Sequence, residues 1–132
     1  MIKVFSNGTY DVLTPAHREL LKYARSLGDI LYVAIDSDNR VKQRKGNDRP
    51  IFNQKERAEH LNDLKYVGCV YLFDSDEQLE DTIKIINPDI MIIGEEYREK
   101  IIIGRQFAKQ IIFFPQVENT SSTNIINKLM NK

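Results

Sequence analysis

GTYDVLTPAH, residues 8–17, joins an apolar, strand-like segment to the first turn of a helix. The preceding residues 2–5 are β-prone, and Thr14-Pro15 is typical of an N-cap followed by proline at the first helical position. We therefore predict a strand over residues 2–5 and a helix over residues 15–27.

The first turn of this helix is a candidate anion site. His17 falls at its third position, on the turn where unpaired backbone N–H groups and the positive end of the helix dipole face outward. Thr14 lies three residues earlier on the same face, so both side chains can donate to phosphate oxygens. Gly8 allows the backbone a tight turn or a close approach to a ligand. A plain helix cap with a surface histidine is the alternative interpretation.

Strand-like and helix-like segments alternate along the rest of the chain. Such alternation predicts a parallel sheet with right-handed crossovers and helices on both faces. We expect a doubly wound, Rossmann-like α/β fold with five parallel strands, forming a single domain over residues 1–132. The predicted strands cover residues 2–5, 30–35, 67–73, 89–93 and 110–114, and the predicted helices cover residues 15–27, 53–64, 77–86, 104–109 and 122–130.

Loops at one edge of such a sheet are where ligands are expected. In open α/β sheets, ligands bind beyond the carboxyl ends of the strands, at the point where the strand order reverses. The loops after the first, second, fourth and fifth strands are therefore candidate sites. Residues 36–53 form a long polar segment rich in basic residues, and connections of that length are often functional.

The composition limits the classes of function. The 132 residues carry 19 basic and 19 acidic side chains, so the chain lacks the basic excess of a general nucleic-acid binder. No apolar run reaches membrane-spanning length and no signal-peptide pattern is present, so we expect a cytoplasmic protein with no membrane partner. Cys69 lies in an apolar run and is expected to be a buried hydrophobe. With His17 and His60 as the two histidines, no metal site held by the protein is expected.

Several motifs resemble those of the cytidylyltransferase-like nucleotidyltransferases, in the family's order and over nearly the whole chain. The family pattern is G-x-F-D, then (H/T)-x-G-H, then, in the branch that makes nucleoside-diphosphate heptoses, K-G-x-x-R-P with a following E-x-R-like region. A glycine before acidic and aromatic residues and an S-T-T-N-I-I motif complete it. The matching residues here are NGTYD at 7–11, TPAH at 14–17, KGNDRP at 45–50, Glu56-Arg57, GEEY at 94–97 and SSTNII at 121–126.

The resemblance implies a nucleotidyltransferase, most similar to the adenylyltransferase domain of ADP-heptose synthase and less closely to glycerol-3-phosphate cytidylyltransferase. Such an enzyme transfers a nucleoside monophosphate from ATP or CTP to a sugar phosphate such as heptose 1-phosphate and releases pyrophosphate. The implied partners are the nucleoside triphosphate and the sugar phosphate. A Mg²⁺ ion bridging phosphate oxygens is expected, held mainly by the nucleotide and water.

The resemblance also implies which residues form the site. Because the attacking phosphate oxygen is already anionic, the protein must position two polyanions and stabilise charge, and it needs no strong general base. The expected catalytic residues are His17, Thr14 and Lys45, with Lys42 or Arg44 helping Lys45 to neutralise phosphate charge from a mobile loop. The expected nucleotide-binding residues are Gly8, Thr9, Tyr10, Thr14, His17, Lys42, Gly94, Ser121, Ser122 and Thr123, and the expected substrate-binding residues are Asp11, Arg49 and Arg57.

Some of these residues have two interpretations. Asp11 is expected to fix the first loop or to orient a donor, since a bare carboxylate would repel a triphosphate. Arg57 either forks onto two phosphate oxygens or forms an ion pair on a helix surface. Tyr97 either stacks on the base or packs against the sheet. Residues 121–123 either form an anion cradle at a helix start or serve as an ordinary N-cap, and we favour both roles together.

Two positions depart from the family signature and keep other functions open. Thr14 stands where the first histidine is found, and Ala16 replaces the glycine. The alternatives are a glycerol-3-phosphate cytidylyltransferase and a non-catalytic nucleotide-binding module. A homodimer through the apolar run 101–103 is a further expectation.

Overall fold

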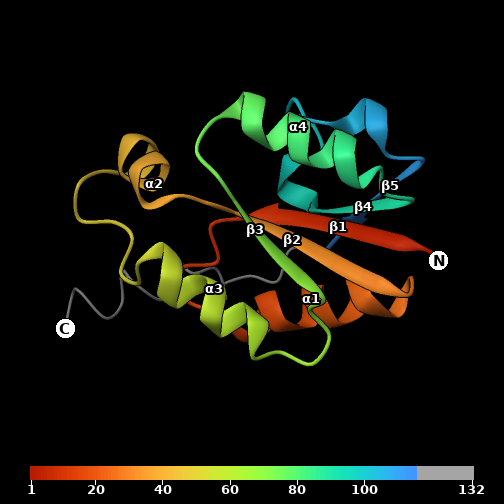
Figure 1. Ribbon diagram of the computed structural model, residues 1–132, viewed down its shortest axis with the longest axis horizontal. Helices are drawn as coiled ribbons and strands as arrows, with labels where there is room; N and C mark the ends of the chain where they lie inside the picture. Colours follow the sequence, from red (N-terminus) through yellow and green to blue (C-terminus); the bar gives the residue numbers. More distant parts are fainter. Residues whose placement is uncertain (116–132) are drawn as a thin grey trace.

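The strands form one parallel sheet in the order β3-β2-β1-β4-β5 (Figure 1). The protein is seen in a computed structural model that describes residues 1–115, and the structural statements below concern those residues. This sheet confirms the predicted doubly wound fold. The strands are β1 (Lys3–Gly8), β2 (Ile30–Asp36), β3 (Cys69–Phe73), β4 (Ile90–Gly94) and β5 (Gln110–Phe114).

The order of the strands reverses at β1. The chain moves outward from β1 through β2 to β3 and then returns to the other side of β1 for β4 and β5. In register, Gly8 at the end of β1 lies beside Ile35 of β2, and Phe5 lies beside Met91 of β4. The carboxyl ends of β1, β2 and β4 therefore share one edge of the sheet, which is where such folds bind their ligands.

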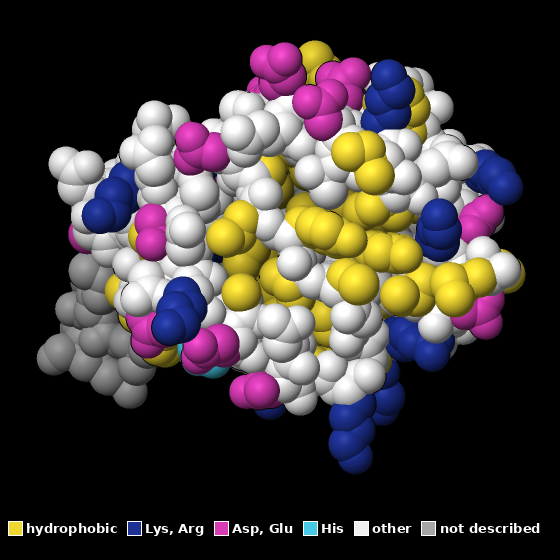
Figure 2. Space-filling model, viewed as in Figure 1, with side chains coloured by type: hydrophobic (Ala, Val, Ile, Leu, Met, Phe, Trp, Pro, Cys, Tyr) yellow, Lys and Arg dark blue, Asp and Glu magenta, His cyan; other side chains and the backbone are white. Residues whose placement is uncertain are grey.

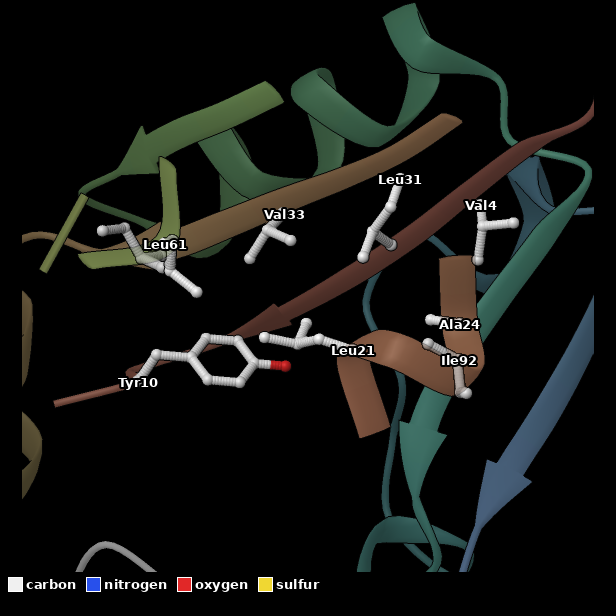
Figure 3. Close-up of a cluster of buried hydrophobic side chains, with 9 residues drawn as sticks. Val4, Tyr10, Leu21, Ala24, Leu31, Val33, Leu61 and Ile92 are labelled. Atoms are coloured by element: carbon white, nitrogen blue, oxygen red, sulfur yellow. The ribbon is translucent and has the colours of Figure 1, made fainter. Parts of the chain in front are cut away.

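Helices cover both faces of the sheet, as predicted. In Figure 1, α1 and α3 lie on one face and α4 on the other. Figure 3 shows the first face, where the Tyr10 ring lies among Leu21, Val33 and Leu61. The helices are α1 (Pro15–Ser26), α2 (Asp38–Lys45), α3 (Gln54–Asn62) and α4 (Asp76–Ile86), with short 3-10 turns η1 (Glu95–Tyr97) and η2 (Arg105–Phe107).

The strand β3 is an outermost strand of the sheet, and it leaves apolar surface uncovered there. Its residues Tyr71 and Leu72 are 40% and 45% exposed. Figure 2 shows hydrophobic side chains gathered on the face where β3 lies in Figure 1. Cys69, expected to be buried, is half-buried on this edge strand, because no further strand covers it.

Two local predictions about the chain after β1 and β2 are wrong. The first strand continues to Gly8, and the left-handed residue of the following loop is Tyr10, at φ 49°, rather than the glycine. The polar segment 36–53, predicted as a mobile loop, contains the helix α2. That helix begins because the Ser37 hydroxyl accepts a hydrogen bond from the Arg40 N–H at 3.2 Å, and it packs through the buried Val41.

Other predicted bounds differ less. The fifth strand is confirmed over residues 110–114, and the predicted helix over 104–109 is reduced to the single turn η2 after Gly104, whose φ is 81°. The predicted helix over 122–130 lies outside the described residues. Within residues 1–115, no helix has the length and apolar character that a membrane crossing requires.

Candidate functional site

The first turn of α1 is built as predicted from Thr14 and Pro15. Thr14 is the N-cap, and its hydroxyl oxygen accepts a hydrogen bond from the His17 backbone N–H at 3.1 Å. A hydroxyl that accepts this bond still has its own proton to donate. The cap therefore leaves Thr14 chemically able to donate to an anion at the helix start.

The His17 ring is held by backbone atoms around the same turn. Its Nδ1 lies 3.1 Å from the Val12 carbonyl oxygen and 3.3 Å from the Thr14 backbone nitrogen. The Tyr10 ring meets it edge-on, with 5.2 Å between the ring centroids. Burial lowers the pKa of His17, and the Lys45 charge acts in the same direction, against the Val12 hydrogen bond and the charge of Glu96.

Lys45, on the connection that follows β2, is the α2 cation whose charge acts on His17 in this turn. Lys45 is the last residue of α2, and Gly46 ends the helix with φ 105°. Burial lowers the pKa of Lys45. Arg49 and Arg44 act in the same direction, whereas the nearby carboxylates of Asp36 and Asp11 oppose the change. Lys45 is therefore within electrostatic reach of both His17 and Arg49.

The Asp11 carboxylate ties the first loop to the start of α3. Its two oxygens accept hydrogen bonds from the Ile51 N–H at 2.8 Å and from the Phe52 N–H at 2.9 Å. Asp11 is buried, and both of these donors belong to the chain just after the KGNDRP motif. Asp11 thus fixes the loop, which is one of the two roles predicted for it.

Arg57 is fully buried and bonded to protein acceptors. Its Nε donates to the Phe52 carbonyl oxygen and its Nη1 to the Thr9 carbonyl oxygen, each at 3.0 Å. Its Nη2 pairs with the Asp38 carboxylate at 2.9 Å. The fork predicted for phosphate oxygens is therefore occupied by protein groups in this structure, and Arg57 joins the first loop, α2 and α3.

Tyr10 is also a core residue rather than an exposed ligand contact. Its hydroxyl lies 2.8 Å from the Ser6 hydroxyl, and burial raises the pKa of Tyr10 to about 12. A Cβ atom at Gly8 would lie 3.1 Å from the Tyr10 ring, so Gly8 provides room for that ring. The glycine serves packing here instead of a turn.

The loop after β4 brings an acidic and an aromatic side chain to the same edge. Both carboxylate oxygens of Glu96 lie 2.6 Å from where a Cβ at Gly94 would stand, so the carboxylate covers that glycine. Burial raises the pKa of Tyr97, with Glu96 and Asp36 acting in the same direction and Arg44 opposing them. The β4 loop and the basic end of α2 are therefore within electrostatic reach of each other.

The remaining predicted residues have simpler settings. Thr9 contributes its carbonyl oxygen to Arg57, Lys42 is exposed on α2, and Arg49 is half-buried near Lys45. Ser121, Ser122 and Thr123 lie outside the described residues. The sequence analysis gave no role to Asp36, which directly follows a predicted strand, or to Glu96, which lies in the GEEY motif after another predicted strand. That position was the available signal.

The described part of the chain offers little for direct metal binding. Over residues 1–115, no group of three or more His, Cys, Asp or Glu side chains is placed to hold a metal ion. The two Asp11 oxygens are already bonded to backbone N–H groups, and Asp36 is paired with arginines. This donor set fits a divalent ion that is carried by a polyphosphate better than one held by the protein.

Comparison with known proteins gives a consistent family. A family model described as cytidylyltransferase-like matches residues 5–128. Proteins named bifunctional protein HldE from Campylobacter fetus and from Helicobacter pylori are each 40% identical to this chain over 126 residues. These matches cover 96% of this chain but 27% of the relatives' own length, so the chain spans about a quarter of the curated relatives it matches.

Solved structures agree with the fold. The lipopolysaccharide core biosynthesis protein from Thermoplasma volcanium has a TM-score of 0.69 and 26% identity, and the match covers 89% of this chain and 99% of that one. A pantoate-beta-alanine ligase from Francisella tularensis has a TM-score of 0.63 over 99% of this chain and 72% of that one. At 14% identity, this second likeness concerns the fold alone.

Proposed function

This chain belongs to the cytidylyltransferase-like family of nucleotidyltransferases, and from that premise we propose that it transfers a nucleoside monophosphate from ATP or CTP to a sugar phosphate. The other product is pyrophosphate. Heptose 1-phosphate is the acceptor we favour, because the KGNDRP motif at residues 45–50 resembles the branch that makes nucleoside-diphosphate heptoses.

The convergence of His17 and Lys45 carries this proposal. They come from different strand-helix connections, yet the charge of Lys45 acts on the pKa of His17 at the carboxyl edge of the sheet. Beside them lies a helix start whose N-cap hydroxyl can still donate. Two cationic or donor groups and a helix N-terminus at one edge suit a triphosphate tail.

The proposed reaction is a direct in-line displacement. An oxygen of the sugar phosphate bonds to the α-phosphorus as the bond from that phosphorus to the bridging oxygen breaks, and pyrophosphate leaves with the electron pair. His17 and Thr14 donate hydrogen bonds to the α- and β-phosphates, and Lys45 neutralises their charge. Because the nucleophile is already an anion, these residues contribute by positioning and by charge stabilisation.

Mg²⁺ belongs to this proposal as an ion carried by the nucleotide. When bound, it supplies charge neutralisation between phosphate oxygens. The oxygens of Asp11 accept backbone N–H bonds, so this carboxylate holds the loop and leaves the ion to the phosphates and water. We give Arg57 the same supporting role, and Arg49, half-buried beside Lys45, remains the candidate for the acceptor phosphate.

A panel of substrate pairs tests the proposal. Each of ATP and CTP is combined with heptose 1-phosphate or glycerol 3-phosphate in the presence of Mg²⁺, and pyrophosphate release is measured. Release with ATP and heptose 1-phosphate is the expected result. Release confined to CTP and glycerol 3-phosphate identifies the cytidylyltransferase alternative, and nucleotide binding without release in any pair identifies the non-catalytic module.

A homodimer remains a proposal, but its surface needs revision. Within the run expected to form it, Ile101 is 96% exposed, whereas Ile102 and Ile103 pack against the core. The outer side of β3, where Tyr71 and Leu72 are exposed, offers another apolar surface. An antiparallel pair of β3 strands would bring the Lys65 end of one strand to the acidic end of the other, at Asp74 and Glu77, which favours a second copy.

Sedimentation analysis tests this surface. Leu72→Lys should shift a dimer towards monomer, while Ile101→Lys serves as a matched exposed control and should not. If the wild-type chain sediments as a monomer at a concentration on the order of tens of micromolar, the dimer is contradicted.

A further inference from the structure

Asp36 is a buried carboxylate at the carboxyl end of β2. Its side chain is 5% exposed, and its Oδ2 accepts from Arg40 Nε at 3.2 Å and from Arg44 Nη1 at 3.4 Å. The two arginines stand four and eight residues further on, so they lie on one face of α2. A single carboxylate thus holds two arginines of one helix.

The two arginines differ in how much else holds them. Arg40 is 14% exposed, also pairs with Asp76, and lies over the Phe73 ring with 5.3 Å from its Cζ to the ring centroid. Arg44 is 60% exposed, and Asp36 is its ion-pair partner among residues 1–115. Arg40 is therefore fixed by several groups, whereas the position of Arg44 depends on Asp36.

Asp36 is not needed to begin α2. The Ser37 hydroxyl caps the helix by accepting from the Arg40 N–H at 3.2 Å. The buried Val41 packs the helix onto the protein. The start and the packing of α2 therefore do not depend on the pairing of Asp36 with Arg44.

We propose that Asp36 is a positioning residue that holds Arg44 at the nucleotide edge of the sheet, where Arg44 binds the phosphate tail. The edge location follows from Asp36, the last residue of β2, which comes directly after Ile35, the residue paired with Gly8 at the end of β1. A guanidinium has five N–H donors, so Arg44 can bond a phosphate oxygen while it stays paired with Asp36. This inference rests on the proposed function only for the identity of the phosphate ligand.

The local charge still favours an anion. The three cations Arg40, Arg44 and Lys45 exceed the two carboxylates of Asp36 and Asp76 by one positive charge. Asp36 also supports the charge on Lys45, whose other charged neighbours are Asp11, Arg44, Arg49 and His17. Loss of the Asp36 charge therefore affects both cations that face the phosphate tail.

Calorimetric titration with inorganic tripolyphosphate and with ATP tests the proposal without requiring turnover. Asp36→Asn and Arg44→Gln should each weaken both ligands about tenfold, the scale of one charge-assisted hydrogen bond. The affinity of the double variant should be at most about twofold weaker than that of either single variant. Asp76→Asn, which removes the other partner of Arg40, is the matched control and should leave both affinities unchanged.

A pH series supplies a readout that general loss of structure would not move. In Asp36→Asn, the alkaline loss of tripolyphosphate affinity should begin at lower pH than in the wild-type chain, because Lys45 loses a carboxylate that supports its charge. In Asp76→Asn that pH should stay where it is. If Asp36→Asn does not fold, the exposed Arg44 still decides the question, and unchanged affinity in Arg44→Gln overturns the proposal.

The outcomes separate this inference from the proposed function. If the affinity losses caused by Asp36→Asn and Arg44→Gln multiply in the double variant, the positioning role is overturned, even if the wild-type chain releases pyrophosphate. If no substrate pair gives pyrophosphate but the two variants weaken tripolyphosphate binding as expected, the proposed enzymatic activity is overturned and the positioning role of Asp36 is kept. A wild-type chain that binds neither tripolyphosphate nor ATP overturns both.

Discussion

The Nδ1 atom of His17 lies 3.1 Å from the carbonyl oxygen of Val12. If the neutral ring donates its Nδ1–H to this carbonyl, its Nε2 is an acceptor, and protonation is required before Nε2 can donate to a phosphate. If Nδ1 instead accepts from the Thr14 N–H, 3.3 Å away, Nε2 already carries the proton. The shorter contact favours the first arrangement.

We expect His17→Ala to lower turnover by about two to four orders of magnitude, because it removes a phosphate donor from the transition state. The fold should persist, since the bond to the Thr14 hydroxyl uses the His17 backbone N–H, which alanine keeps. Steady-state pyrophosphate release gives the rate, and circular dichroism checks the fold. A folded variant with wild-type turnover removes His17 from the mechanism.

Nucleotide binding near neutral pH should be accompanied by proton uptake. Burial lowers the pKa of His17 in the free protein, whereas a bound triphosphate favours the charged ring and raises that pKa. The affinity should therefore weaken as pH rises through the His17 pKa of the complex. Titration calorimetry in buffers of different ionisation enthalpy measures the proton uptake, which His17→Asn should abolish.

Zero uptake by the wild-type chain would mean that Nδ1 accepts from Thr14 and that neutral His17 donates through Nε2. That result would contradict the arrangement favoured by the Val12 contact.

The free protein should lose stability as pH falls below about 6.5, the ordinary histidine pKa. Because burial lowers the pKa of His17 in the folded state, the unfolded chain binds more protons between the two pKa values. Stability therefore declines as pH falls through this window, and His17→Asn should reduce the slope there. Urea denaturation at several pH values measures it, and an unchanged slope in the variant would show that the His17 shift is absent.

Much of the fold follows from local patterns in the sequence. The run QIIFF at residues 110–114 lies between Lys109 and Pro115 and becomes β5 with those bounds. The Thr14-Pro15 pair starts α1 as predicted, because a hydroxyl cap and a proline at the first position act within a few residues of each other. Of the four connections predicted to form the site, those after β1, β2 and β4 meet at one edge, and the connection after β5 lies outside the described residues.

The rest depends on contacts between residues far apart in the chain. The helix α2 has the sequence DNRVKQRK, in which Val41 is the one buried residue, so the sequence has no amphipathic period that would predict this helix. Arg57 is separated by 48 residues from Thr9, and its burial cannot be read from its own helix. The left-handed conformation of Tyr10 depends on the packing of its ring in the core, which overrides the usual preference for glycine.

Arg57→Lys should destabilise the protein by about 3 kcal/mol, because one ammonium group cannot replace three hydrogen bonds in a buried site. For the molecules that remain folded, the KM for the sugar phosphate should change less than about threefold, the scale of an interaction not made to substrate. Urea denaturation and initial rates measure the two effects. Arg105→Lys, at an exposed arginine, is the matched control. A stable variant with a much higher KM would restore the substrate-binding role.

The two roles of Thr14, as helix cap and as phosphate donor, can be tested separately, because some side chains that cap a helix cannot donate a hydrogen bond to a phosphate. Thr14→Ser should preserve stability and turnover. Thr14→Ala should cost about 1 kcal/mol of stability through loss of the cap, and turnover should fall as well.

Thr14→Asp should keep the cap, since its carboxylate accepts from the His17 N–H at the positive end of α1. The same carboxylate has no proton to donate and repels a triphosphate, so turnover should fall by more than about tenfold although the protein remains stable. Thermal melting and pyrophosphate release measure the two roles, and wild-type turnover in Thr14→Asp would reduce Thr14 to a helix cap.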